Sequence, residues 1–306
     1  MSGARARRLT ARSLVFFCLI ESLATITAYA ANSAKAQLSK FSDKEFQQVQ
    51  AAARSGDANA AAVVGVAYEE GIRVPQDMEQ AIEWYRRAAD QGDVAVQHRL
   101  GLIYEEGRGV AQNFAEAAAW YSKAAALGYA PSQVNLGNLY REGRGVARDL
   151  AQAAKWYEVA ARQGNAQAQT NIGYMYNYGE GVVHDDQQAV DWYRKAAEQG
   201  FAVAEKNLGV MYKLGRGVEA DERQAIAWFE KAAAQGLPRA WVNEAIIYMQ
   251  GKQIAPDYNR AYQLLQQAIA AGENDAAPLL QQCSQHLQPD NPLVIESNAT
   301  AHRSPQ

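Results

Sequence analysis

The feature that most constrains this chain is a sequence period of 36 residues that recurs six times without an insertion. The six units start at Gly56, Gly92, Gly128, Gly164, Gly200 and Gly236, and Gly272 opens an incomplete seventh unit. A fixed period of this length indicates a solenoid, in which each repeat is one supersecondary unit that packs on its neighbours. Because no unit carries an insertion, we expect equivalent helices to stack in the same register.

The sequence of each unit predicts two helices, and the second helix begins at an Asp or Asn. In the first unit this residue is Asp77, and Gln80 follows three positions later. The spacing is that of a capping box, in which two side chains satisfy two backbone donors reciprocally at a helix start. It recurs in every unit except the sixth, where Arg260 takes the third position. Apolar residues, including a Trp followed by an aromatic residue, then recur at helical spacing in the first five units.

The first helix of each unit carries a small residue, an apolar residue, Gly and Tyr, as in Ala168, Ile172, Gly173 and Tyr176. Because Ala and Gly have little bulk, we expect the aromatic pair of the second helix to fill the space beside them. The first helix should end at the pattern G-x-G-V, whose glycines permit positive backbone torsions. The valine of that pattern is expected to pack the loop against the core.

The pattern degenerates at both ends, as the capping units of a solenoid do. A lone helix is predicted at residues 43–55, before six full repeats at 56–271, and a last helix at 273–287. In the sixth repeat Leu264 and Leu265 replace the aromatic pair, and Ala245 replaces Gly. The sequence therefore predicts an all-α solenoid over residues 43–287, with a linker at 31–42 and a disordered tail at 288–306.

Residues 1–30 are predicted to be a signal peptide. A basic start leads into the apolar run Leu14–Ile20, and Ala28-Tyr29-Ala30 has the small-x-small form of a cleavage site. The uninterrupted run is shorter than the roughly 20 residues that a membrane-spanning helix needs. We therefore expect export to the periplasm or beyond the cell. After cleavage Cys283 would be the sole cysteine, so that packing and not a disulfide must stabilise the fold.

The charge balance argues against nucleic-acid partners. Beyond residue 30 the chain carries 26 basic and 32 acidic side chains. Nucleic acids need a positive protein surface that displaces their counterions.

The recurring patterns L-G-x-x-Y, G-x-G-V and A-x-x-W-Y-x-x-A-A resemble the Sel-one-like repeat (SLR) family, a relative of the tetratricopeptide repeat, over about residues 43–287. The resemblance implies a right-handed superhelix of antiparallel helix pairs that acts as an adaptor or scaffold for protein complexes. It also implies an exported protein of envelope processes or host interaction. Two alternatives stay open, namely a secreted factor that engages host proteins and a cell-wall or β-lactam-acting enzyme. The enzymatic activity is what a resemblance to a cysteine-rich branch of the family would imply. This chain departs from that branch, because its six full repeats contain no cysteine.

The candidate binding residues lie on the first helices, which line the concave side in solenoids of this kind. The fourth, eighth, eleventh and fifteenth positions of each unit share one face of that helix. Four successive units carry Asn at the eighth position, namely Asn135, Asn171, Asn207 and Asn243. An Asn amide offers a donor and an acceptor that match one peptide unit of an extended ligand. The tetratricopeptide pattern places this Asn where clamp-type members hold a ligand backbone. The alternative is that each Asn bonds a neighbouring repeat and orders the stack.

The same face is apolar in its middle to late part, at Tyr174, Tyr178, Val210, Leu214 and Ile246. Such a patch indicates a binding surface if it is exposed, and burial inside a tightly curved superhelix is the alternative. Arg99, with three glutamates, gives the early part of the face a polar character. We therefore expect a protein or peptide partner, held by these residues and by the four asparagines.

No pattern for catalysis, a cofactor or a metal stands out in the sequence. The four histidines lack a Glu or His at metal-ligand spacing. Cys283 takes a repeat position that is apolar in other units, so we expect a buried residue and not a nucleophile. The G-x-G segments end helices, whereas phosphate sites lie where helices begin. The sequence therefore predicts a non-catalytic scaffold.

Overall fold

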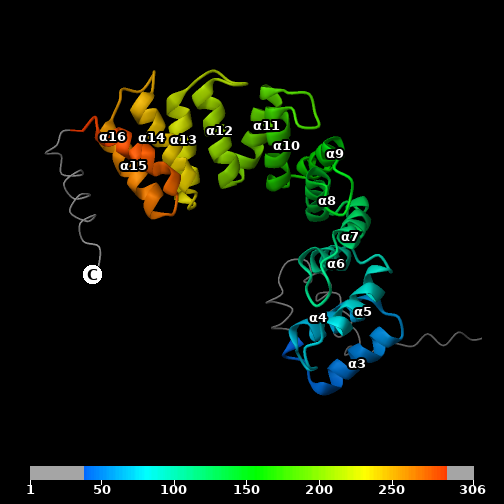
Figure 1. The fold of residues 1–306 in the computed structure, drawn as a ribbon. Helices are drawn as coiled ribbons and strands as arrows, with labels where there is room; N and C mark the ends of the chain where they lie inside the picture. The colour runs from blue at the N-terminus through cyan, green and yellow to red at the C-terminus, as the bar shows by residue number, and fades with distance from the viewer. Residues whose placement is uncertain (1–37, 288–306) are drawn as a thin grey trace, which may run out of the picture. The chain divides into compact units, whose positions relative to one another are not determined.

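The computed structural model describes residues 38–287, and this range forms fourteen α-helices, a short 3-10 helix and no strand (Figure 1). The predicted all-α repeat architecture is confirmed. The chain divides into two compact units, residues 1–156 and 157–306, and each is described by itself. The predicted signal peptide at 1–30, the first part of the predicted linker and the predicted tail at 288–306 lie outside the described residues.

The first unit begins with a lone helix, and helix pairs follow it. Its helices are α3 (Asp43–Arg54), α4 (Ala58–Glu70), α5 (Met78–Ala89), α6 (Val94–Glu106), α7 (Phe114–Ala126), α8 (Ala130–Glu142) and the first part of α9 (Leu150–Arg162). Consecutive helices from α3 to α8 pack against each other.

The second unit continues the pattern of first and second helices. It contains the rest of α9, then α10 (Ala166–Tyr178), α11 (Asp186–Glu198), α12 (Ala202–Leu214), α13 (Glu222–Ala234), α14 (Pro238–Gln250), α15 (Tyr258–Ala270), the 3-10 helix η1 (Asn274–Ala276) and α16 (Ala277–Ser284). Consecutive helices from α10 to α16 pack against each other.

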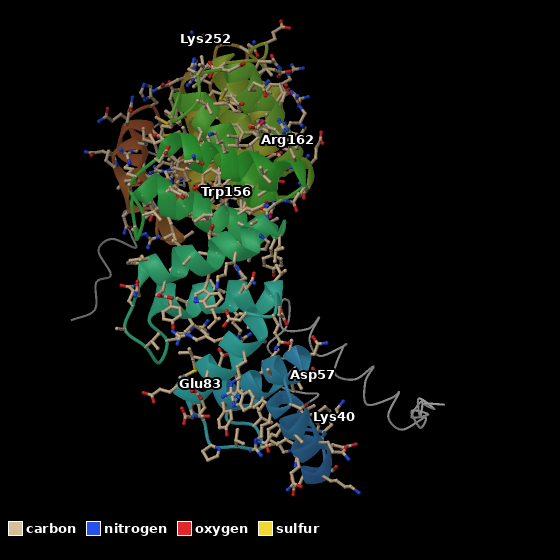
Figure 2. All side chains as sticks on the ribbon, turned by 90° about the vertical axis from the view of Figure 1, so that its right-hand side faces the viewer. Lys40, Asp57, Glu83, Trp156, Arg162 and Lys252 are labelled. Carbon is tan, nitrogen blue, oxygen red and sulfur yellow. The ribbon has the colours of Figure 1, made fainter. Side chains whose placement is uncertain are left out.

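Charged side chains in both units, such as Glu83, Arg162 and Lys252, are exposed (Figure 2).

The second helices start at the predicted cap residues, but the predicted capping box is wrong in its second half. The Asp77 carboxylate accepts the backbone N–H of Gln80 at 3.0 Å. The backbone N–H of Asp77 itself donates to the carbonyl oxygen of Tyr68 at 2.9 Å, and not to the Gln80 side chain. The same bond joins Asn113 to Tyr104, Asp149 to Tyr140, Asp185 to Tyr176, Asp221 to Tyr212 and Asp257 to Tyr248, at 2.8–3.0 Å.

This bond has a simple physical reason. The last carbonyl groups of an α-helix have no partner within the helix, and an unpaired buried carbonyl costs free energy. The tyrosine of L-G-x-x-Y lies in the last turn of each first helix, so its carbonyl is such a group. The cap N–H of the following helix satisfies it and thereby ties the two helices of a repeat together. A complete capping box does occur at the start of α3, between Ser42 and Glu45.

A close contact between glycine and an aromatic ring holds the two helices of a repeat. A Cβ atom on Gly65 would lie 2.5 Å from the ring of Tyr85, and one on Gly209 would lie 2.6 Å from Phe229. The aromatic residues are fully buried. The helices therefore approach more closely than any residue with a side chain would allow, as the sequence predicted.

The loops after the first helices also follow the prediction. Gly107 ends α6 with φ of 71°, and Gly109 in the same loop has φ of 69°. Val110 and Val146 pack against the core of the first unit, and Val218 packs against a core cluster of the second. At the amino-terminal end Leu38 and Phe41, from the segment predicted as linker, are buried in the core beside α3.

The sixth repeat is packed differently from the others. Ala245 replaces the glycine and Leu265 replaces the ring, and both are fully buried. Glu244 stands where the other repeats carry Val, Leu or Ile, and only 1% of its surface is exposed. Its Oε1 atom lies 3.6 Å from Arg260 Nη2, too far for a hydrogen bond, and has no other partner in the described part of the chain. Burial raises the pKa of Glu244 to about 7.

Gly209→Ala should destabilise the second unit by about 1–3 kcal/mol, because the new methyl group overlaps the buried Phe229 ring. The overlap outweighs the roughly 1 kcal/mol by which Ala is the better helix former. Urea unfolding measures the change. The double variant Gly209→Ala/Phe229→Leu copies the sixth repeat and should lose less than the sum of the two single variants. Additive losses, or a stable Gly209→Ala variant, would contradict the contact.

The Glu244 carboxyl predicts a stability that falls with rising pH. Its pKa in the folded chain is raised above the ordinary value of 4.5, so burial favours the protonated form. The stability is therefore full below about pH 4.5 and is lost as the pH rises through 7. Glu244→Gln should lessen the fall in Tm between pH 5 and pH 8, whereas Glu83→Gln on the exposed face of α5 should not. An unchanged pH profile in Glu244→Gln would refute this assignment.

Candidate protein-binding face

The first-helix face is defined here as the fourth, eighth, eleventh and fifteenth residues of each repeat. These positions lie on α4, α6 and α8 in the first unit and on α10, α12 and α14 in the second. Arg99 and Asn135 belong to the first unit, and the other eight predicted binding residues belong to the second. Tyr174, Tyr178 and Leu214 are exposed. The other predicted residues are half-buried, namely Arg99, Asn135, Asn171, Asn207, Val210, Asn243 and Ile246.

In the first unit the predicted Arg99 forms a buried ion pair. Its Nε atom donates to Glu69 at 2.7 Å, and Glu69 is 6% exposed. Glu69 also accepts from the Tyr85 hydroxyl at 2.5 Å and from Arg108 at 3.1 Å. Burial favours the neutral carboxyl, but these donors outweigh it and hold the pKa of Glu69 below its usual value. The Arg99 charge is therefore already neutralised within the fold.

The same arrangement recurs one repeat later. The Tyr121 hydroxyl donates to Glu105 at 2.7 Å, and Arg144 lies 3.4 Å from the other oxygen of that carboxylate. The Asn135 side chain lies within hydrogen-bonding reach of the same hydroxyl. Asn135 thus lies beside Tyr121 of the neighbouring repeat.

In the second unit the same face is apolar and open. The rings of Tyr174 and Tyr178 lie 4.5 Å apart at 37°, and 60% of Tyr178 is exposed. Leu214 on α12 is 54% exposed. Within residues 38–287 the Asn171, Asn207 and Asn243 side chains make no hydrogen bond. The Asn135 side chain, by contrast, lies close to the Tyr121 hydroxyl.

A small groove of about 320 Å³ opens at one end of this face. Its apolar residues include Leu214 and Ile246, both of them predicted binding residues. Lys213, Gln250 and Lys252 supply polar groups around them. The groove joins the ends of α12 and α14, so it extends the first-helix face of the second unit.

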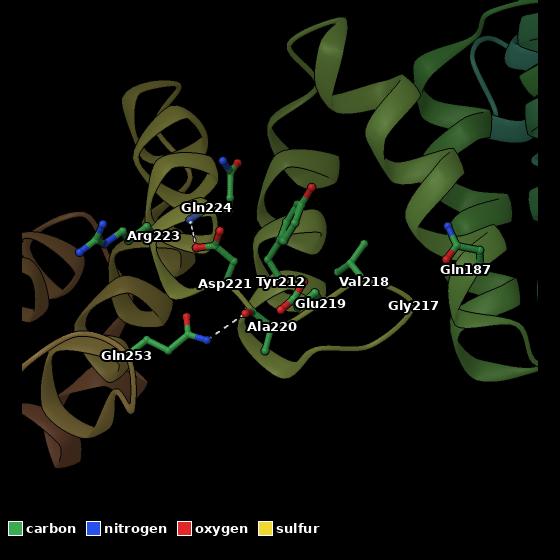
Figure 3. Close-up of a pocket in the computed structure, with 10 residues that line it drawn as sticks. All are labelled: Gln187, Tyr212, Gly217, Val218, Glu219, Ala220, Asp221, Arg223, Gln224 and Gln253. Atoms are coloured by element: carbon green, nitrogen blue, oxygen red, sulfur yellow. Dashed lines mark hydrogen bonds between the residues drawn. The ribbon is translucent and has the colours of Figure 1, made fainter.

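A larger and more polar hollow of about 890 Å³ lies along the loop before α13 (Figure 3). Its lining includes Tyr212, Glu219, Asp221 and Gln253, and none of the predicted binding residues. The Asp221 carboxylate caps α13 by accepting the backbone N–H of Gln224 at 3.0 Å. Gln253 donates to the carbonyl of Ala220 at 2.9 Å. These polar groups hold the loop in place, so the hollow is a weaker candidate than the first-helix face.

Several groups whose side chains suggest chemistry lie in the described residues. No cluster of three or more His, Cys, Asp or Glu there could hold a metal ion. The Nδ1 atom of His98 lies 2.9 Å from the Ser132 hydroxyl, but Ser132 is fully buried. Burial also lowers the pKa of His98 to about 4. Cys283 is buried as predicted. No helix between residues 38 and 287 is long and apolar enough to cross a membrane.

Sequence reasoning missed two features. One is the pairing of Glu69 and Glu105 with the second-helix tyrosines. Its signal in the sequence was a Glu at the fourteenth position of the first and second repeats. An Arg stands at the seventeenth position of the repeat that follows each of them, namely Arg108 and Arg144. The other is Glu244, whose signal was an acidic residue at a position that is apolar in five other repeats. Both departures from the pattern could be read in the sequence once the repeats were aligned.

Comparison with known proteins identifies the repeats. The Sel1 repeat family model matches residues 58–93, 94–129, 130–165, 166–201, 202–237 and 245–273. No curated protein sequence matches the chain.

Two solved structures are similar. One is a protective antigen of uropathogenic Escherichia coli with an SLR fold, at 38% identity over 77% of this chain and a TM-score of 0.70. The match covers only 50% of that antigen, so this chain corresponds to about half of its length. The other is a Sel1 repeat protein from Oxalobacter formigenes, at 29% identity, with 82% of this chain and 96% of that chain covered and a TM-score of 0.65. The chain belongs to the Sel1 repeat family, whose members are typically scaffolds for protein interactions.

Proposed function

We propose that this protein is an exported, non-catalytic scaffold that binds an extended protein or peptide segment on the first-helix face of its second unit. The family supplies the general role, because Sel1 repeats are protein–protein interaction modules. The observation that carries the specific site is the exposure of Tyr178 and Leu214 on that face. Large apolar side chains in an exposed cluster favour a binding surface, and tyrosine is enriched at the energetic centres of interfaces.

The asparagines supply a reason for an extended ligand. Asn171, Asn207 and Asn243 occupy the same position on α10, α12 and α14, so their amides repeat from one first helix to the next. Each amide offers a donor and an acceptor to a passing main chain. In the described residues none of them is used by another repeat. A ladder of this kind holds a backbone without selecting its side chains, while the apolar residues beside it provide contact area.

The first unit has a different part in this proposal. Its equivalent polar residues, including Arg99 and Asn135, contact Glu69 and Tyr121 and so order the stack. We assign the first unit to stability and the second to binding. Arg99 and Asn135 remain predicted binding residues that a partner would have to displace from these contacts.

The proposed export rests on the amino-terminal sequence alone. A basic start, the apolar run Leu14–Ile20 and the Ala28-Tyr29-Ala30 site are the three parts of a cleavable signal. We place the protein in the periplasm. The E. coli structure with 38% identity is described as a protective antigen, which favours a host-facing address as the second candidate.

Asn171→Ala/Asn207→Ala should reduce partner capture about fivefold or more, because two main-chain contacts are lost, each worth about 0.5–1.5 kcal/mol. A crosslinking pull-down from the native envelope, quantified by mass spectrometry, measures the loss. Gln263→Ala/Gln267→Ala on the exposed side of α15 is the matched control and should capture as much as the unaltered protein. Undiminished capture by the asparagine variant, with its Tm unchanged, would refute the site.

Export predicts a mature chain that begins after Ala30. Intact-mass measurement of the protein isolated from a periplasmic extract should give the mass of residues 31–306. Replacement of Ala28 and Ala30 with Leu should block cleavage, because the signal peptidase site requires small residues. An uncleaved chain in the cytoplasmic fraction would disprove the address, and recovery of the mature chain from the culture medium would favour the host-facing candidate.

A further inference from the structure

Two lysines, Lys206 and Lys213, border the first-helix face on α12, at the seventh and fourteenth positions of their repeat. Lys206, Val210 and Lys213 are spaced by four and three residues, which places them on one side of the helix. The equivalent positions on α10 and α14 carry Thr170 and Val242, and then Asn177 and Met249; none of these four is basic. Within the second unit, basic residues at these two positions therefore occur on α12 alone; in the first unit Arg141 on α8 is the equivalent of Lys213.

Lys206 has no counter-ion. It is half-buried, and no ion pair or hydrogen bond of its ammonium group exists within the described range of the chain. The charged neighbour that it senses is Arg239 on α14, which carries the same sign. Arg239 is itself satisfied, at 3.1 Å by Glu273 and at 2.7 Å by Asp275. Burial and, secondarily, this like charge lower the pKa of Lys206. The charged ammonium group is therefore destabilised, and an anion beside it would stabilise that charge.

Lys213 is also poorly compensated. It is half-buried, and burial lowers its pKa although Glu222 acts in the opposite direction. The Glu222 carboxylate accepts three backbone N–H groups, from Lys252, Gln253 and Ile254, each at 2.8 Å. Its oxygens are therefore committed to the loop after α14. Lys213 instead lines the small groove beside Leu214.

We propose that the segment bound on the second unit is acidic, with carboxylates opposite Lys206 and Lys213 and apolar side chains on Leu214 and Tyr178. This inference rests on the proposed function and names the chemistry of its ligand. A half-buried ammonium without a partner is destabilising, and an incoming carboxylate recovers part of that cost. A neutral or basic segment would leave Lys206 uncompensated or repel it. Charge complementarity thus selects among the extended segments that the asparagines would otherwise hold alike.

A random peptide library displayed on phage tests this selection. Twelve-residue peptides are selected on the immobilised full-length protein and on Lys206→Met/Lys213→Met, in which methionine keeps the apolar stem and removes the charge. We expect Asp and Glu to be enriched in the peptides selected on the unaltered protein and not on the double variant. The control is Lys195→Met on the exposed side of α11, which should select the same acidic peptides as the unaltered protein.

Fluorescence anisotropy then compares the best selected peptide with a copy in which Gln replaces each acidic residue. The unaltered protein should bind the acidic peptide at least tenfold more tightly, and Lys206→Met/Lys213→Met should lose that preference while binding the Gln copy as before. Retained binding of the Gln copy shows that the face is intact in the variant.

Three outcomes have distinct meanings. Selected peptides without acidic residues, whose binding still depends on Asn171 and Asn207, would overturn this inference and leave the proposed function standing. Failure to select any peptide that depends on those asparagines would overturn both. Concentration-dependent dimerisation in sedimentation experiments that Lys206→Met/Lys213→Met abolishes would also overturn the inference, because the occupant would then be a second copy of the chain.

Discussion

The contact between the glycine of a first helix and the aromatic ring of the following second helix is the constraint on which the rest of the fold depends. A methyl group at Gly209 would lie 2.6 Å from Phe229, so only glycine lets the two helices come this close with the ring between them. The bond from each second-helix cap N–H to a first-helix tyrosine carbonyl then sets the position of one helix along the other. Together these two contacts fix the helix pair, and successive pairs bury their apolar sides against each other within each unit.

Once the pair is fixed, the residues of the first-helix face can differ between repeats. In the first unit Glu69 and Arg99 bond each other, and second-helix tyrosine hydroxyls complete the network. In the second unit Tyr178 and Leu214 are exposed on the same face, and the uncompensated Lys206 lies beside it. One backbone pattern thus supports both a self-satisfied surface and an exposed, partly apolar one. This contrast is why the proposed binding site is assigned to the second unit.

The periodicity was sufficient to predict the helix pairs, the caps and the buried glycines, because these depend on residue types that recur every 36 positions. Contacts between different repeats were harder to predict. The role of Arg99 depends on Glu69 in the preceding repeat, and the sequence alone does not say which side chains meet across a helix stack. The capping-box error arose within a repeat, because the tyrosine carbonyl that accepts the cap N–H lies on the preceding helix and the spacing in the second helix does not reveal it. The exposure of Tyr178 likewise depends on how neighbouring helices pack, and the sequence pattern left both burial and exposure open.

The central claim is that a partner covers the first-helix face of the second unit. Hydroxyl-radical footprinting of the free and the partner-bound protein, read by mass spectrometry, measures side-chain exposure directly. The account predicts that oxidation of Tyr178 and Leu214 falls severalfold on binding, while Leu127, which is 59% exposed at the end of α7, is unchanged. Protection of Leu127, or of the loop around Gln253, with Tyr178 and Leu214 still fully reactive, would contradict it.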